Sequence, residues 1–567
     1  MTSFKFWHGR METSMMMEGR RTFGFLLTIV VTFAIAPLIA ILGYTFLKDG
    51  QFDISQINRM LEAERVWRTL GNSILLGVLV IVGTTIIAFP MALIRTKTSL
   101  YRYDWLDIIL TIPFMTPPYI GSMGWILFMQ HNGFLQQLFP SSAWLTETFF
   151  SLFGMVMIMS LHLFPFLYLM LKNTLLRMNG SFLDAALIFG RSPWRNWTKI
   201  VLPLVVSSYV LGSLLIFIKT LAEFGTPATF GSRIGFQVFT TEIHTYLSRW
   251  PVDISMATSL SLFLLSVCLV IWYIQNLIGR KHTYGVLSGK TPAMREVRDK
   301  WCIKLGSWMF VGAVLLLSIG IPYFSIVVTS LQKVRGNGLQ AGNFSFASYQ
   351  EVFTGGSAGL SAFLNSVMFS VITAVVTAII GLCIALYIKK GETKKQQFLD
   401  FFSLMPTIVP GIVFVVGLIM FWNAPWLPAT IYNTKTMVVV TYCVLFLPYS
   451  VQYTKSSLSQ IDSSIFQSAA IFGRSKWEVY RQIIIPLLMQ GILAGMMMTF
   501  IISMRELVAG LLILPPSVET GATFIYSQFE QGNVGVGMAV AVITVVMTVI
   551  FMFLLEWLKK RGGHENA

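Results

Sequence analysis

Ionisable side chains that interrupt apolar stretches are the first candidates for chemistry in this sequence: Lys219, Glu223, Arg505 and Glu506. Such groups are costly in an apolar medium and are often functional. One interpretation places Glu223 and Glu506 face to face, as a gate or relay for a cation. The other pairs Arg505 with an acid, while Lys219 extends to a polar boundary. Carboxylates suit a hard metal cation and the positive side chains suit an anion, so the charges leave both open.

A nucleotide site is the second possibility, because residues 285–291 (GVLSGKT) come close to a phosphate-binding loop. The segment is one residue short, since Tyr284 stands where the motif needs its first glycine, and no strand precedes it. We therefore predict that this chain does not hydrolyse ATP itself. The four cysteines and six histidines show no ligand spacing, which predicts neither a disulfide framework nor a structural metal site.

The composition indicates lipid as the main solvent of the elements that carry these residues. Hydrophobic residues make up 55% of the 567 positions and charged residues 12%, whereas soluble domains average about 25% charged residues. The formal net charge of +16 does not indicate nucleic-acid binding, because the basic residues lie between apolar stretches and form no compact module.

Twelve apolar stretches are long enough to cross a bilayer, which needs about 20 residues for a helix. The first six are 23–47, 70–94, 106–129, 151–171, 202–222 and 256–279; the second six are 307–331, 363–388, 398–421, 436–453, 485–514 and 535–557. Arg20 and Arg21 before the first stretch resemble a signal peptide, but the stretch exceeds a signal core of about 7–15 residues, so we favour an uncleaved span.

The loops between these stretches differ sharply in charge. Of the 41 Lys and Arg residues, 30 lie in the segments that would share one side with the N-terminus. Basic loops stay in the cytoplasm, so we predict that residues 1–22, the linker 280–306 and the tail 558–567 are all cytoplasmic.

An internal repeat divides the chain into two halves, 23–279 and 307–557. Residues 183–204 (LDAALIFGRSPWRNWTKIVLPL) align without a gap with residues 466–487 (FQSAAIFGRSKWEVYRQIIIPL), and 10 of 22 positions are identical. Each half holds six predicted spans, an even number, so the halves enter the membrane in the same orientation. We expect an all-α membrane protein built as a parallel repeat, with a pathway between its halves.

Each repeated segment follows the fourth span of its half and reads as two short helices joined at a glycine. Small residues precede the turn, glycine permits the bend, and proline opens the next span. This pattern resembles the EAA loop of importer permeases, which implies a type I ATP-binding-cassette importer fold. The resemblance also implies that each loop is a coupling helix seated in a groove of an ATPase. It assigns this contact to Asp184, Ala185, Ala186, Gly190, Arg191, Pro203, Gln467, Ser468, Ala469, Gly473, Arg474 and Pro486. The family's glutamate is replaced by Asp184 and Gln467, which weakens the case for a full negative charge there.

The double length and the motif around Glu223 (EFGTP, 223–227) resemble the fused permeases of ferric-iron importers. That resemblance implies an inner-membrane permease working with two copies of an ATPase, which use ATP and Mg, and with an extracytoplasmic binding protein. Phosphonate, sugar-phosphate, thiamine and polyamine importers are related alternatives within the superfamily. From another class, an ion-gradient-driven secondary transporter would also show twelve spans in two halves, but it would not need the duplicated loop.

Overall fold

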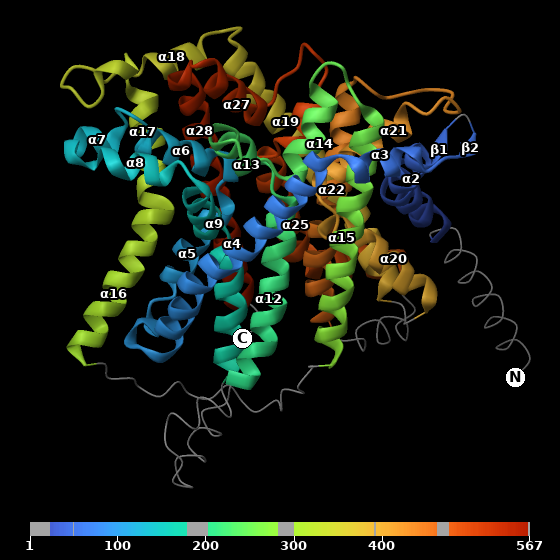
Figure 1. Cartoon of the computed structure of the whole chain (residues 1–567). Helices are drawn as coiled ribbons and strands as arrows, with labels where there is room; N and C mark the ends of the chain where they lie inside the picture. The colour runs from blue at the N-terminus through green and yellow to red at the C-terminus, as the bar shows by residue number, and fades with distance from the viewer. Residues whose placement is uncertain are drawn as a thin grey trace, which may run out of the picture.

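The computed structural model describes residues 23–48, 50–177, 202–281, 300–389, 393–461 and 476–564. Nearly all of these residues are helical, and the one small sheet is the hairpin of β1 (Leu47–Lys48) and β2 (Gln51–Phe52). Long helices run side by side and short helices cover one end of the bundle (Figure 1). We call that end the capped end, and we call the opposite end, where α28 finishes, the loop end.

Ten helices in the described part of the chain are long and apolar enough to cross a membrane. The first half contributes Phe23–Phe46 (ending in α2, Ala36–Phe46), α4 (Glu64–Lys97), α9 (Leu152–Arg177), α12 (Leu202–Ala222) and α15 (Ile254–Lys281). The second half contributes Trp301–Leu331 (α16, Trp301–Leu315, then α17, Ile321–Leu331), α19 (Ala358–Ile388), α22 (Lys435–Ser459), α25 (Ile485–Met504) and α28 (Val534–His564).

The third stretch of each half is not the single helix that the sequence predicted. Residues 106–129 form α5 (Trp105–Met115) and α6 (Pro118–Met129), and residues 398–421 form α20 (Lys394–Leu404) and α21 (Gly411–Trp422), which are bent by 108°. Proline explains both breaks, because it removes a backbone donor and disfavours helix in the residue before it. Pro117 and Pro410 occupy the N-cap positions of α6 and α21.

The predicted span 485–514 also ends early, at Met504, and a short separate helix α26 (Val508–Ile513) follows it. The first half repeats this arrangement, because α12 is followed by α13 (Gly225–Thr229). Six more short helices complete the capped end: α3 (Ser55–Glu62), α7 (Phe134–Leu138), α8 (Ala143–Phe149), α14 (Phe239–Ser248), α18 (Ala347–Phe353) and α27 (Gly521–Gln531).

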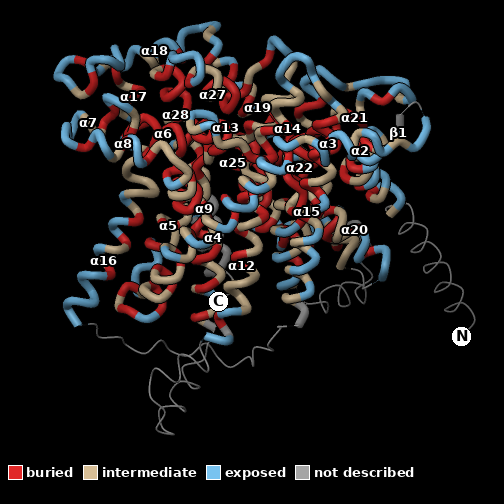
Figure 2. Tube along the Cα trace, in the orientation of Figure 1, coloured by how far each residue is buried: buried red, intermediate tan, exposed pale blue. Residues whose placement is uncertain are grey.

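The two halves exchange their first helices. α17 of the second half packs on α6 of the first, and α2 of the first half packs on α21 of the second. Gly124 and Gly417 make this contact possible, because a Cβ at either position would lie within 3 Å of the Pro322 or Pro37 backbone. The two largest buried clusters therefore each contain residues from both halves, and buried positions fill the interior of the bundle (Figure 2).

A second repeated contact attaches the capped end to the long helices. The Asn72 side-chain amide donates to the Gln237 carbonyl at 3.0 Å, and Asn365 donates to the Glu519 carbonyl at the same distance. The next residue in each case, Ser73 or Ser366, accepts a backbone N–H at the start of α14 or α27. The parallel repeat thus extends to individual hydrogen bonds.

Candidate functional site

Glu223 lies directly after α12 and turns back onto the short helix α13. Its Oε1 accepts the backbone N–H of Gly225 at 2.8 Å and of Thr226 at 3.3 Å, while its carbonyl accepts the Thr240 hydroxyl at 2.7 Å. A carboxylate at this position satisfies free N–H groups and is favoured by the positive end of the helix. Glu223 therefore fixes the turn between the fifth span and the capped end.

Glu506 performs the same function in the second half. Its Oε1 accepts the Ala509 N–H at 3.0 Å at the start of α26, and its carbonyl lies 3.5 Å from the Tyr442 hydroxyl. The two acidic residues that the sequence paired, Glu223 and Glu506, thus occupy equivalent positions in the folded halves. Their carboxylates are held by backbone N–H groups.

Arg505 joins the two halves. Its Nη1 donates to the carbonyls of Phe114 at 2.6 Å and Thr116 at 3.3 Å, and its guanidinium lies 5.3 Å from the Phe114 ring centre. These carbonyls are exposed because the helix is broken after α5, and a broken helix within a membrane needs other donors. Within the described residues Arg505 is not within ion-pair distance of either glutamate, so its observed partners are backbone carbonyls.

Tyr119 and Tyr442 complete a polar cluster at this junction. Both tyrosines are 1% exposed, and the Tyr119 hydroxyl has no hydrogen-bond partner in the described structure. The backbone of Gly225 lies against Tyr119, and the charges of Arg505 and Glu506 act on its hydroxyl. We call Tyr119, Glu223, Tyr442, Arg505 and Glu506 the junction cluster. Lys219 is outside it, on α12, half-buried and with no polar contact among the described residues.

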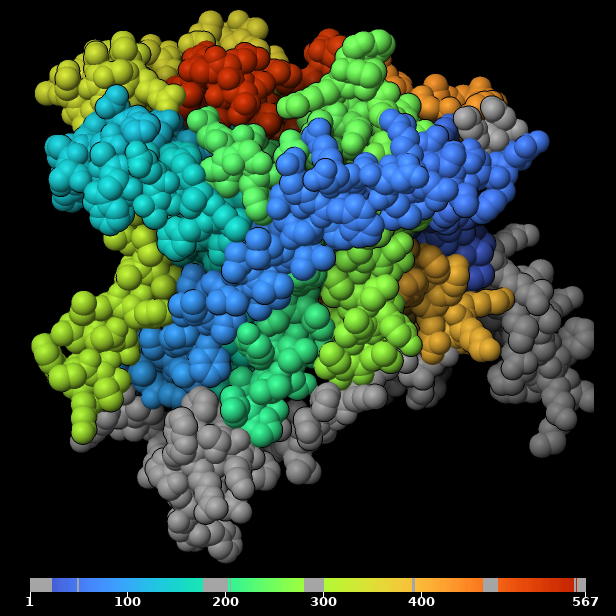
Figure 3. Space-filling model, viewed as in Figure 1, coloured from blue at the N-terminus to red at the C-terminus, as the bar shows by residue number. Residues whose placement is uncertain are grey.

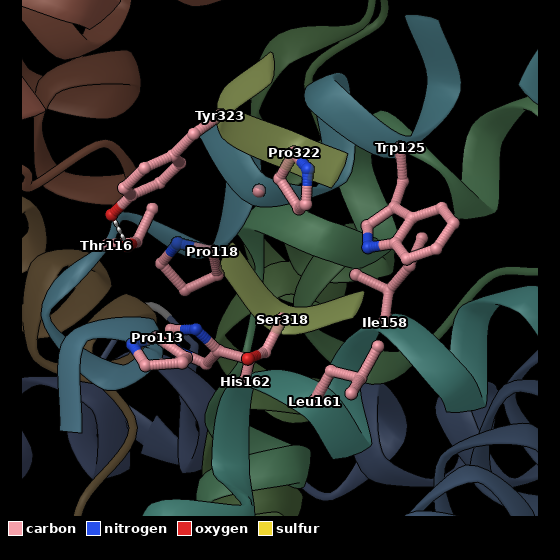
Figure 4. Close-up of a pocket in the computed structure, with 11 residues that line it drawn as sticks. Pro113, Thr116, Pro118, Trp125, Ile158, Leu161, His162, Ser318, Pro322 and Tyr323 are labelled. Atoms are coloured by element: carbon pink, nitrogen blue, oxygen red, sulfur yellow. Dashed lines mark hydrogen bonds between the residues drawn. The ribbon is translucent and has the colours of Figure 1, made fainter. Parts of the chain in front are cut away.

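A small cavity lies beside the break between α5 and α6 (Figure 4). Its volume is about 20 Å³, which is room for one water molecule. Thr116 from the first half hydrogen-bonds Tyr323 from the second at its edge, and His162 and Ser318 also line it. The break is therefore held by two residues of the other half, Arg505 and Tyr323.

Comparison with known proteins identifies the architecture. The chain matches the family described as binding-protein-dependent transport system inner membrane component over residues 84–284 and again over residues 378–562. It belongs to this family. The two matches confirm the predicted repeat, and with the ten candidate spans they make the chain a multi-pass protein of the inner membrane.

Individual relatives match along nearly the whole chain. The ferric transport system permease protein FbpB of Actinobacillus pleuropneumoniae is 24% identical over 96% of this chain and 79% of its own length. The Fe(3+)-transport system permease protein FbpB 2 of Haemophilus influenzae is 25% identical over 94% of this chain and 98% of its own length. A putative 2-aminoethylphosphonate permease protein of Salmonella typhimurium is 26% identical, but over only 32% of this chain.

The structure also shows a pair of ionic contacts near the loop end of this membrane component. Asp107 on α5 accepts from the Arg95 guanidinium at 3.0 and 2.7 Å, and from Lys172 on α9 and Tyr168. In the second half Asp400 on α20 binds Lys455 on α22. Each aspartate joins the first part of the broken span to the span that precedes a repeated loop. We call the two pairs, Asp107–Lys172 and Asp400–Lys455, the span clamps.

Sequence reasoning missed these clamps, although the repeat contains the signal. Asp400 follows Asp107 by 293 positions and Lys455 follows Lys172 by 283, which are the two offsets that relate other paired residues of the halves. The tyrosines of the junction cluster have no such signal. Ile412 stands opposite Tyr119 at the first offset and Met159 opposite Tyr442 at the second.

Most of the predicted ATPase contact lies outside the described residues: Asp184, Ala185, Ala186, Gly190, Arg191, Gln467, Ser468, Ala469, Gly473 and Arg474. The two prolines that end the repeated segments are described. Pro203 is the second residue of α12, and Pro486 lies in the first turn of α25. Proline is tolerated there because the first N–H groups of a helix have no partner within it, so both prolines open the fifth spans as expected.

Proposed function

We propose that this chain is the translocation subunit of an ATP-driven importer of ferric iron. The observation that carries the proposal is the extent of similarity to ferric permeases, which covers 96% and 94% of the chain. The phosphonate permease resembles only one segment of 181 residues, 32% of this chain. Three hundred and more matched residues beyond that segment therefore favour iron over phosphonate as the substrate.

The orientation and partners are part of this proposal. The Lys and Arg excess supports an orientation with the loop end, both termini and the linker in the cytoplasm. Two copies of an ATPase, using ATP and Mg, bind the repeated segments 183–204 and 466–487. A substrate-loaded binding protein docks on the capped end, outside the membrane. ATP-driven closure moves the loops, and the halves alternate between inward-open and outward-open states.

The junction cluster is the proposed gate of the pathway. It combines first-half Tyr119 and Glu223 with second-half Tyr442, Arg505 and Glu506, so a relative movement of the halves must change it. The carboxylate oxygens offer hard ligands to a ferric ion as it passes.

The test is reconstitution of the chain with its co-purifying ATPase and binding protein in proteoliposomes. Uptake of radioactive ferric iron that requires both ATP and the binding protein is the expected result. Uptake of 2-aminoethylphosphonate instead would show that the substrate is an anion, which the positive charge of Arg505 would attract. Uptake that persists without ATP would indicate a gradient-driven transporter.

A further inference from the structure

A second and larger cavity opens at the capped end, away from the junction cluster. Its volume is about 280 Å³, many times the share of one water molecule in the liquid. The loop after α17, the helix α18 and the first turn of α28 form its walls. In Figure 3 the corresponding yellow and red surfaces adjoin at the upper left.

The walls of this cavity carry unbalanced positive charge. Lys333 and Arg335 line it, and Glu351 is the one carboxylate among the lining residues. Burial lowers the pKa of Arg335, and the nearby charge of Arg233 of the first half lowers it further. In the described structure none of these three cations forms an ion pair. Neighbouring guanidinium groups without a bridging anion repel one another, and a bound oxyanion would relieve that repulsion.

Neutral donors converge on the same space. Val534, Gly535 and Val536 line the cavity with the first turn of α28, whose N–H groups have no partner within the helix and attract anions. Thr329 lines it as well; it is 2% exposed, and its hydroxyl has no hydrogen-bond partner. A buried donor without a partner is unfavourable, so this hydroxyl is available to donate to an oxyanion in the cavity.

Side-chain hydrogen bonds support the loop that presents the cations. The buried Asn343 side chain donates to the carbonyls of Val334 at 2.9 Å and Gly338 at 2.8 Å, and accepts the Val334 N–H at 3.0 Å. Gln137 of the first half accepts the Leu339 N–H at 3.0 Å. Lys333 and Arg335 therefore stand on a preformed support, which lowers the entropy cost of binding.

We propose that this cavity binds a small oxyanion, a phosphate or carboxylate group, held by Lys333, Arg335, Thr329 and the first turn of α28. The site is separate from the translocation pathway, and it does not depend on which substrate is carried. The same chemical group could be supplied by a free anion or by an acidic side chain of a protein that docks on the capped end.

Binding of inorganic phosphate to the full-length protein in nanodiscs, measured by calorimetry, tests the site. Lys333→Gln and Arg335→Gln should each weaken binding by about tenfold, because each removes one charge-assisted contact. Thr329→Val should weaken it by a smaller factor, and Glu351→Gln should tighten it. The matched control is Lys435→Gln, which removes an exposed lysine at the start of α22 and should leave affinity unchanged.

Equal weakening by Lys435→Gln, or an equal response to chloride at the same ionic strength, would overturn the proposal by showing non-specific attraction. Absence of phosphate binding to the wild-type protein would also overturn it. A transport assay then distinguishes the sources. Phosphate should inhibit uptake if a docking protein's carboxylate uses the cavity, and should leave uptake unchanged if the natural ligand is a free anion.

Discussion

At the residue scale, Arg505 has the least replaceable contacts in the junction cluster. It reaches two carbonyls of the other half with one nitrogen and lies over the Phe114 ring. Arg505→Met keeps most of the volume but leaves these carbonyls without a donor, and we expect the free energy of unfolding to fall by about 1–3 kcal/mol. Arg505→Lys keeps the charge without the planar guanidinium, so its free energy of unfolding should lie between those of the wild-type protein and Arg505→Met.

Thermal denaturation in detergent measures this effect. Arg233→Met is the matched control, because Arg233 also lies over an aromatic ring, Phe529, but its guanidinium makes no hydrogen bond to a carbonyl among the described residues. If Arg505→Met and Arg233→Met lower the melting temperature equally, the carbonyl contacts do not stabilise the joined halves.

Glu506 allows charge to be separated from helix capping. Glu506→Gln keeps an oxygen that can accept the Ala509 N–H, so α26 should stay in place. It removes the negative charge, so uptake should be abolished while assembly with the ATPase remains intact. Uptake and co-purification are measured together, with Glu530→Gln as the control for loss of an exposed carboxylate on α27. Unchanged uptake would reduce Glu506 to a structural cap.

The sequence could predict the positions of Glu223 and Glu506 but not what surrounds them. Their equivalence follows from the internal repeat, which can be recognised in the sequence alone. The contact of Arg505 with the α5–α6 break could not be predicted, because it depends on where a proline-rich span bends. The roles of Tyr119 and Tyr442 could not be predicted for a related reason: a tyrosine in an apolar stretch does not reveal which face of its helix is turned inward.

At the element scale, the span clamps connect the broken spans to the helices that lead into the repeated loops. The Asp400–Lys455 pair is about one-third exposed at each side chain, and exposed pairs contribute only about 0.2–1 kcal/mol to stability. Asp400→Asn should therefore leave thermal stability almost unchanged. We expect uptake to fall several-fold while ATP hydrolysis continues, because the loop no longer moves α20.

Exchanging the two charges of the Asp400–Lys455 pair is the decisive test of this prediction. The double variant Asp400→Lys with Lys455→Asp should recover part of the lost uptake, and Lys394→Gln, an exposed change on the same helix, should have no effect. Failure of the double variant to exceed both single variants would show that the pair does not transmit movement.

The exchanged first helices give a second prediction at this scale. A Cβ at Gly124 would lie 2.7 Å from the Pro322 carbonyl oxygen, whereas a Cβ at Gly121, on the same helix, would meet nothing within 4 Å. Gly124→Ala should destabilise the protein by about 1–3 kcal/mol through overpacking. Gly121→Ala should be neutral or stabilising, because glycine weakens a helix interior by about 0.5–1 kcal/mol. Similar melting temperatures for the two variants would contradict the close α6–α17 packing.

Ten of the twelve predicted spans contain a helix long and apolar enough to cross a membrane, because apolar length is the main requirement for crossing. The two failures share one cause. Pro117 and Pro410, at the N-caps of α6 and α21, interrupt stretches whose hydropathy is otherwise sufficient. The exchange of first helices could not be predicted either, because the sequence does not show whether a glycine in an apolar span packs against lipid or against a neighbouring backbone.

At the scale of the whole molecule, the halves are joined by the exchanged helices, the Arg505 contact and the Thr116–Tyr323 hydrogen bond. We expect such interlocked halves to move as packed bodies, so that force applied at a repeated loop would reach the junction cluster through the long helices. The loops themselves lie outside the described residues, and their role remains a prediction from the sequence. If this predicted role is correct, a variant with a disturbed loop should hydrolyse ATP without transporting substrate.

Gly190→Val restricts the turn of the first loop, and Ala469→Trp blocks close approach of a partner to the second. In proteoliposomes with the ATPase and binding protein, both variants should lose uptake, and any remaining ATP hydrolysis should no longer respond to the loaded binding protein. Gly289→Val, in the linker between the halves, is the matched control and should transport normally. Normal transport by either loop variant would disprove the coupling assignment, because an ATPase that drives the halves through these segments cannot tolerate a bulky residue at the contact.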